Sequence, residues 1–139
     1  MRSILVLNSK GGSGKTTIAT NLASFYASIG KQVALVDLDS QESSISRLKA
    51  RSSAKPPITG IKGYGVKVKR GVDYKIIDAP AGLQGAALTK VLNMAESVII
   101  PVLPSPIDMR AAGEFIKNIK KHSRVVKKKS KIALVANRG

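Results

Sequence analysis

Short, mostly apolar runs alternate with amphipathic stretches along this chain. The runs have the length of strands, and few polar interruptions are typical of strands buried on both faces. They lie at 4–7, 33–39, 74–78, 97–102 and 131–137. Between them, apolar side chains recur every three or four positions, which predicts helices with one buried side. The helical stripes are Ile18, Leu22, Phe25 and Ile29; Ile45 and Leu48; Leu88, Val91, Leu92 and Ala95; and Phe115, Ile116 and Ile119.

This alternation predicts an α/β fold in which a mostly parallel sheet is flanked by helices on both faces. We expect a single domain over residues 1–139, because this length is near the commonest domain size and no repeat or low-complexity linker divides the chain. The segment 51–72 is the hardest to assign, since Pro56, Pro57 and four glycines interrupt any long element. Within it, residues 58–62 fit a short edge strand.

A glycine-rich turn joins the first apolar run to the first helical stripe. Its glycines permit backbone conformations closed to residues with a Cβ, so that successive N–H groups can converge on phosphate oxygens at the positive end of a helix. In such a turn Lys15 would reach the β- and γ-phosphates of a nucleotide, and the Thr16 hydroxyl would coordinate Mg²⁺. The alternative, a glycine-rich turn without a ligand, is disfavoured by the flanking strand and helix. The predicted nucleotide-binding residues of the turn are Lys10, Gly11, Gly12, Ser13, Gly14, Lys15, Thr16 and Thr17.

Three aspartates stand at the ends of two predicted strands. Asp37 and Asp39 close the run that begins at residue 33, and Asp78 closes the run that begins at residue 74. Open α/β sheets bind their ligands at the carboxyl ends of the strands. Each aspartate taken alone fits a helix cap or a turn equally well. Beside a phosphate-binding turn, however, the three together indicate a nucleotide and metal site.

The turn departs from the usual phosphate-loop pattern, because Ser9 stands where that pattern has its first glycine. The sequence Lys-Gly-Gly-x-Gly-Lys-Thr-Thr instead resembles the deviant Walker A motif of the ParA/MinD family of dimerising P-loop ATPases. The resemblance implies that Lys10 reaches across a dimer to the phosphates bound by the other subunit. It also implies that Asp39 positions or polarises the attacking water, that Asp37 supports the phosphate loop and metal, and that Asp78 holds Mg²⁺ through water.

Further segments carry the same resemblance. Residues 37–41 look like the family's Asp-x-Asp-Pro-Gln segment, with Ser40 in place of the usual proline, which implies a freer backbone at this switch. Residues 104–108 look like the Pro-Ser-Pro-x-Asp segment of small ParA-type partition ATPases. Asn137 lies where the family begins its base-binding loops, and it is our candidate for contact with the nucleotide base. Since family members normally continue beyond this point, we expect the domain to lack the family's usual C-terminal portion.

The net charge of +16 is concentrated in two segments. Residues 46–73 carry eight basic side chains and one acidic one, and residues 117–139 carry nine basic side chains and none that is acidic. A stripe of like charge repels itself unless a polyanion covers it. The predicted DNA-binding residues of the second segment are Lys117, Lys120, Lys121, Arg124, Lys127, Lys128 and Lys129.

No obvious base-reading side chains or stacking platform accompany these cations, which favours sequence-independent contact with the phosphates of duplex DNA. The alternative is a basic surface that contacts only solvent, since many runs of charged residues have no macromolecular partner. Anionic lipid fits less well, since the MinD-like members bind membrane through a C-terminal amphipathic helix and this sequence shows none.

The composition bears on the cellular compartment and on membrane insertion. The sequence contains no cysteine, which fits a reducing cytoplasm and excludes those relatives that hold an iron–sulfur cluster on cysteine thiolates. Its apolar runs are far shorter than the roughly 20 residues that span a bilayer. We therefore expect a cytoplasmic, nucleoid-associated protein that does not enter the membrane.

Together these features predict a ParA-like ATPase with ATP and Mg²⁺ as cofactors. It would form an ATP-dependent homodimer, bind nonspecific double-stranded DNA and be stimulated by a ParB-like or other small activator protein. Its task would be to segregate or position a plasmid, a chromosome or a protein cargo. Two alternatives remain open: a P-loop metabolic ligase of the dethiobiotin-synthetase type, and a truncated remnant that does not hydrolyse ATP.

Overall fold

The computed structural model describes residues 1–7, 15–39, 43–49, 51, 55–65, 67–121 and 131–136. Within these residues six strands form one sheet in the order β3-β2-β4-β1-β5-β6, and every pair of neighbours is parallel. The predicted α/β fold with a parallel sheet is confirmed, and the short edge strand expected near 58–62 is present as β3. The strands are β1 (Arg2–Val6), β2 (Val33–Asp37), β3 (Thr59–Lys62), β4 (Tyr74–Asp78), β5 (Ser97–Val102) and β6 (Lys131–Ala136).

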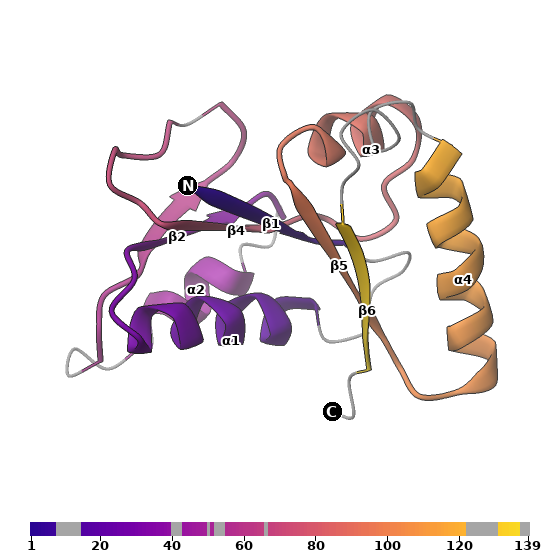
Figure 1. Ribbon diagram of the computed structural model, residues 1–139, viewed down its shortest axis with the longest axis horizontal. Helices are drawn as coiled ribbons and strands as arrows, with labels where there is room; N and C mark the ends of the chain where they lie inside the picture. Colours follow the sequence, from indigo (N-terminus) through magenta and orange to yellow (C-terminus); the bar gives the residue numbers. More distant parts are fainter. Residues whose placement is uncertain are drawn as a thin grey trace.

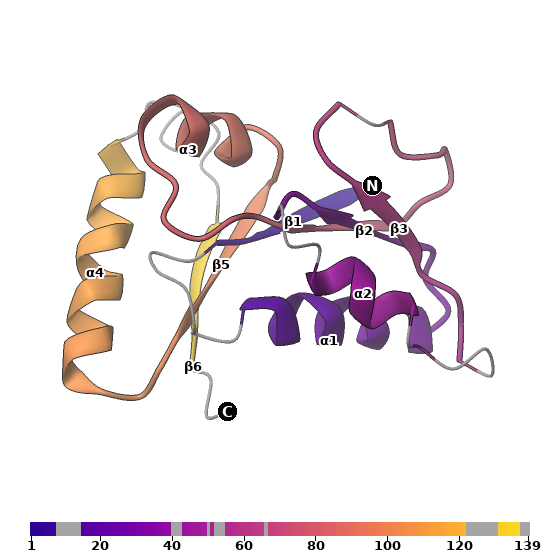
Figure 2. The ribbon, with the colours of Figure 1, turned by 180° about the vertical axis from the view of Figure 1, so that it is seen from behind.

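Helices cover both faces of the sheet. α1 and α2 lie on one face and α3 and α4 on the other (Figures 1 and 2). Parallel strands need such crossover connections, because the chain must return to the same end of the sheet before the next strand begins. The helices are α1 (Lys15–Ser28), α2 (Ser43–Lys49), α3 (Gly85–Leu92) and α4 (Pro106–Lys121).

Two separate apolar clusters fill the space between the sheet and its helices. On one face, alternate residues of the central strands, such as Leu35 and Ile76, pack against α1. On the other face the intervening residues, such as Leu5 and Ile77, pack against α3 and α4. Side chains alternate between the two faces of a strand, so each continuous apolar run supplies both clusters.

The buried side of α1 matches only part of the predicted stripe: Ile18 and Leu22 are half-buried and pack against this core as expected. Phe25 and Ile29 were expected on the apolar side of this helix, but they are 56% and 54% exposed, and Ile29 lies beyond the end of the helix. The residues that face the sheet are the alanines Ala19, Ala23 and Ala27, spaced four apart. Small side chains let the helix approach the sheet closely, and this places the larger Phe25 at the solvent side.

The connection between β3 and β4 covers a part of the sheet that no helix reaches. Figures 1 and 2 show it above β2 and β4, on the face away from α1 and α2. Tyr64 in this connection lies under the ammonium group of Lys90 of α3, whose Nζ is 4.2 Å from the ring centroid. Val68 packs on the edge of the core that α3 and α4 share. None of the helices in the described ranges is both long enough and apolar enough to cross a membrane.

Candidate nucleotide-binding site

Two buried carboxylates lie side by side at the carboxyl edge of the sheet. Asp37 is the last residue of β2 and Asp78 the last of β4, and the two are direct partners in the parallel ladder. Asp78 is also the ladder partner of Val6, the last residue of β1. The strand that leads into the glycine-rich turn therefore ends beside Asp78, and Asp37 lies one strand further along the same edge. This is the edge where open α/β sheets bind their ligands.

Asp37 holds the segment that follows β2. Its Oδ1 accepts a hydrogen bond from the backbone N–H of Asp39 at 3.0 Å, and its Oδ2 accepts one from the N–H of Ile45 in α2 at 3.1 Å. Its backbone carbonyl accepts a further bond from Gly63 at 2.9 Å. A buried carboxylate needs such donors to offset the loss of water. Asp37 thus fixes both the start of the loop that carries Asp39 and the position of α2.

Asp78 is fixed from the same helix. The hydroxyl of Ser44, which is fully buried in α2, donates a hydrogen bond to Oδ2 of Asp78. The Asp78 carbonyl accepts a bond from Leu38 N–H at 2.9 Å, one residue beyond β2. α2 is consequently attached to both carboxylates through two consecutive residues, Ser44 and Ile45.

Sequence reasoning missed Ser44. The only signal in the chain is a pair of serines just before the apolar residues Ile45 and Leu48, and serine is common near the start of any helix. Its contact with Asp78 joins residues 34 positions apart. Such a contact can be recognised only once the ladder has placed β4 next to β2.

Asp39, the predicted water-positioning residue, is half-buried just past the end of β2. Its backbone bond to Asp37 ties its place to that of the buried acid. Asp39 and α2 are therefore both hydrogen-bonded to the carboxylate of Asp37. A movement of that carboxylate would displace both.

The predicted phosphate turn and several other candidates fall outside the described residues. β1 ends at Val6 and α1 begins at Lys15, so the turn runs from the end of a central strand to the start of a helix, as a phosphate loop requires. The backbone of Lys15, Thr16 and Thr17 opens α1, but their side chains are not described. Also outside the described part are Ser9, Lys10, Gly11, Gly12, Ser13, Gly14, Ser40, Arg124, Lys127, Lys128, Lys129 and Asn137.

The chemistry of the two buried acids fits Mg²⁺. This ion prefers oxygen ligands, keeps several waters and is usually held by one or two carboxylates together with the phosphates of its substrate. The described part of the chain holds no group of three or more His, Cys, Asp or Glu residues that would form an all-protein metal cage. The adjacent aspartates Asp37 and Asp78, beside the predicted phosphate turn, fit the smaller donor set with which proteins usually hold Mg²⁺.

The predicted Pro-Ser-Pro-x-Asp segment has a structural role at the start of α4. Ser105 precedes the helix, and its hydroxyl accepts the N–H of Asp108 at 3.2 Å and donates to the Asp108 carboxylate. The Ser105 carbonyl accepts the first helical bond, from Met109 N–H at 2.9 Å. Pro106 stands at the first helical position, where its missing N–H costs nothing. Serine, proline and aspartate in this spacing therefore form a helix cap.

The predicted DNA-binding residues of the second basic segment, called the basic stripe below, are described only in part, and the described ones lie on the outer side of α4. Lys117, Lys120 and Lys121 are exposed, whereas Ile119 between them is buried against the sheet. α4 begins four residues after the end of β5 and runs back along the sheet, so these lysines lie toward the edge opposite the two aspartates. The described lysines of α4 are thus separated from the edge that carries the two aspartates.

Comparison with known proteins agrees with this geometry. The model of the CobQ/CobB/MinD/ParA nucleotide binding domain matches residues 4–138. The chain belongs to this family. It is 31% identical over 147 aligned positions to the maintenance of carboxysome distribution protein A of Halothiobacillus neapolitanus, which covers 97% of this chain and 65% of that protein. The chain thus spans less than two thirds of the length of that relative.

Solved structures show the same fold. A chain of the MinC:MinD cell division protein complex of Aquifex aeolicus superposes with a TM-score of 0.74 at 19% identity, over 100% of this chain and 69% of the other. The structure of pNOB8 ParA bound to nonspecific DNA superposes with a TM-score of 0.66 at 20% identity, over 85% and 59% of the two chains. At these identities the likeness shows that this chain shares the fold of those proteins.

Proposed function

We propose that this protein is a ParA/MinD-type ATPase that binds ATP with Mg²⁺ and takes part in positioning or partition. The observation that carries the proposal is the adjacent buried pair of Asp37 and Asp78, which lies beside the strand that leads into the Lys-Gly-Gly-Ser-Gly-Lys-Thr-Thr turn. The resemblance to a protein that maintains carboxysome distribution supports the positioning role.

Each group has a defined task in this proposal. Lys15 and the N–H groups of the turn hold the phosphates, while Thr16, Asp37 and Asp78 hold the metal. Bound Mg²⁺ neutralises charge on the phosphate oxygens. Asp39 orients a water for attack on the terminal phosphorus.

The hydrogen bonds of Asp37 make hydrolysis and conformation interdependent. Asp37 holds the backbone of Asp39 with one carboxylate oxygen and α2 with the other. A change in how the nucleotide engages Asp37 would move Asp39 and α2 together. We propose that this linkage lets the site report whether ATP or ADP is bound.

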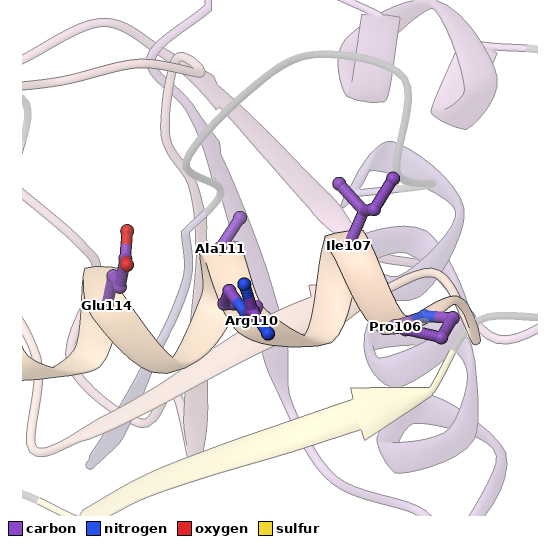
Figure 3. Close-up of a pocket in the computed structure, with 5 residues that line it drawn as sticks. All are labelled: Pro106, Ile107, Arg110, Ala111 and Glu114. Carbon is purple, nitrogen blue, oxygen red and sulfur yellow. The ribbon is translucent and has the colours of Figure 1, made fainter.

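Dimerisation would complete the site. Lys10 is proposed to contact phosphates held by a second copy of the chain, so the carboxyl edge of the sheet must face that copy. The start of α4 lies at this edge and offers a cavity of about 380 Å³ lined by Pro106, Ile107, Arg110, Ala111 and Glu114. Figure 3 shows Ile107, Ala111 and Glu114 on one side of the helix.

The exposure of apolar residues there supports contact with a second copy. Ile107, which lines the cavity, is 79% exposed, and Met109, on another side of the same first turn of α4, is 60% exposed. Large apolar side chains gathered at one end of a helix are typical of surfaces that a partner covers.

The basic stripe is proposed to bind duplex DNA without sequence preference. Lys117, Lys120 and Lys121 are exposed on α4, and the related pNOB8 ParA was solved on nonspecific DNA. Because the dimer carries two such stripes, ATP would strengthen DNA binding. An activator protein of the ParB-like kind would then release the dimer by stimulating hydrolysis, and nucleoid association would follow from the DNA contact.

Measurement of ATP hydrolysis with and without duplex DNA tests the proposal, with Asp39→Ala as the hydrolysis-deficient control. The proposal expects slow hydrolysis that responds to DNA and is absent in the control. Hydrolysis that requires a small-molecule substrate would instead identify a metabolic ligase. Nucleotide binding without any turnover would identify a non-hydrolysing remnant.

A further inference from the structure

A second concave site lies on the sheet face away from α1 and α2. It is a cavity of about 510 Å³ between the connection that follows β3 and the strands β2 and β3. Its walls come from the sheet, through Gln32, Ala34, Thr59 and Ile61, and from the segment 67–72. This volume lies in the range of sites that bind small molecules or peptide side chains.

The cavity lies over the row of the sheet that contains Ala34. Ala34 is the ladder partner of Thr59 on one side and of Lys75 on the other. The next row on this face carries larger apolar residues, such as Val36 and Ile77, which pack under α3. Ala34 is buried but belongs to neither of the two apolar clusters of the described core. The segment 67–72 covers this row so closely that Ala34 is 0% exposed, and the open part of the cavity is bounded by the half-buried Ile61, Val68 and Val72.

The cavity combines an apolar interior with a cationic rim. Ile61, Val68 and Val72 supply apolar surface, and none of the described residues that line the space is acidic. On the roof, the exposed cations are Lys67, Lys69 and Arg70.

Within the described ranges, no carboxylate forms an ion pair with these three side chains. The neighbouring Asp73 instead accepts the backbone N–H of Gln32 at 2.8 Å. Three uncompensated cations around an apolar hollow favour a ligand that carries both negative charge and an apolar group.

This cavity is separate from the nucleotide site. Ala34 and Asp37 are three positions apart on β2, and successive side chains point to opposite faces, so the two lie on different faces of the sheet. Asp37 contacts α2, whereas the cavity lies where no helix covers the sheet.

We propose that this cavity binds an acidic peptide segment of a partner protein through an apolar anchor side chain. The anchor packs against Ile61, Val68 and Val72, and flanking carboxylates face Lys67, Lys69 and Arg70. Buried apolar anchors carry most of the affinity of such interfaces, while rim charges guide orientation and association. Duplex DNA fits less well, because its phosphates would contact the cations but leave the apolar hollow empty.

Fluorescence anisotropy with a labelled synthetic peptide, Glu-Asp-Glu-Leu-Leu-Glu-Asp-Glu, tests the proposal. The control peptide has both leucines replaced by serine. We expect the leucine peptide to bind at least about tenfold more tightly, because only it fills the apolar hollow. Equal binding of the two peptides, or no binding of either, would overturn the proposal.

Variants of the protein localise the contact. Val72→Thr keeps the charge and the branched shape of the side chain but makes the cavity wall more polar, so peptide affinity should fall about threefold to tenfold. Lys67→Ser with Lys69→Ser should weaken binding by a similar factor, whereas Lys49→Ser with Lys55→Ser, an exposed pair in the same basic segment, should not. Circular dichroism checks that each variant folds. If Lys67 and Lys69 affect binding of duplex DNA and not of the peptide, the site is a DNA contact and the proposal is wrong.

The test is independent of ATP hydrolysis. Lys15→Ala, which should not bind nucleotide, is expected to bind the leucine peptide as the parent does. Failure of nucleotide binding in the parent would therefore contradict the proposed function, and failure of peptide binding would contradict this second site.

Discussion

The carboxyl edge of the sheet and the basic outer surfaces use charge in opposite ways. At the edge, Asp37 and Asp78 are buried and held by backbone and hydroxyl donors from α2. On the outside, Lys117, Lys120 and Lys121 are exposed on α4. Buried charges require a fixed geometry, whereas exposed charges act through their number and are screened by salt. Substitutions at the edge should therefore have large, specific effects, and substitutions on the surface should have graded effects that depend on ionic strength.

The largest effect is expected at the phosphate turn. Lys15→Ala removes the cation that contacts the β- and γ-phosphates and should abolish measurable nucleotide binding. Asp39→Ala should bind ATP but lose hydrolysis by at least about 100-fold, because water is no longer positioned. Binding of a fluorescent ATP analogue and phosphate release measure the two steps.

The oligomeric state provides the check. Size-exclusion chromatography with light scattering in ATP and Mg²⁺ should show Asp39→Ala trapped as a dimer. If this variant remains monomeric where the parent dimerises, the role assigned to Asp39 is wrong.

The second lysine of the turn should separate binding from dimerisation. If Lys10 acts on the partner's phosphates, Lys10→Ala should bind ATP as a monomer yet neither dimerise nor hydrolyse it. Mixing this variant with Asp39→Ala, which keeps Lys10, should restore hydrolysis in the mixed dimer, at the site of the subunit with intact Asp39. Normal hydrolysis by Lys10→Ala alone would show that Lys10 does not act across a dimer.

A smaller effect is expected from Ser44, and it concerns stability. Ser44→Ala removes a donor from the buried Asp78 carboxylate and should lower the free energy of unfolding by about 1–3 kcal/mol. Ser46→Ala is the matched control, because Ser46 lies in the same helix but is exposed. Thermal denaturation followed by circular dichroism should show a fall of several degrees for the first variant alone. Equal melting temperatures would mean that the hydroxyl contributes nothing to holding Asp78.

These contrasts also explain what the sequence could and could not predict. The strands were predictable, because burial on both faces leaves continuous apolar runs that nothing else in the chain imitates. The convergence of Asp37 and Asp78 was predictable as well, since both end parallel strands. The buried side of α1 was predictable only in part, because Phe25 is far more apolar than the three alanines that in fact face the sheet.

The remaining misses depend on register. Ser44 meets Asp78, and Ala34 lies beside Thr59, only because β2 pairs with β4 on one side and β3 on the other. The local sequence does not indicate which strands pair or in which register. Similarly, Asp37 was expected to support the phosphate loop and metal, and that role stays a prediction. Its hydrogen bonds to Asp39 and Ile45 depend on how α2 packs beside the end of β2, which the local sequence does not indicate.

The smallest effect is expected from the basic stripe on α4, and it concerns how affinity for DNA depends on salt. Phosphate contacts release counterions, so log affinity for DNA should fall linearly with log salt, by about 0.9 per phosphate contacted. Lys120→Ala with Lys121→Ala should make this slope shallower by up to about 2 and leave ATP binding intact. ATP should steepen the slope of the parent, because a dimer presents both stripes.

Fluorescence anisotropy on two unrelated duplexes, at several salt concentrations and with or without ATP, measures these quantities. Lys49→Ala with Lys55→Ala removes the same charge from exposed positions outside α4 and should change the slope less. An equal change in both double variants would show that DNA responds to net charge and not to the α4 stripe. A strong preference for one duplex would contradict sequence-independent contact. An unchanged slope after loss of Lys120 and Lys121 would leave the stripe as a solvated surface, because a phosphate contact cannot be removed without returning its counterion.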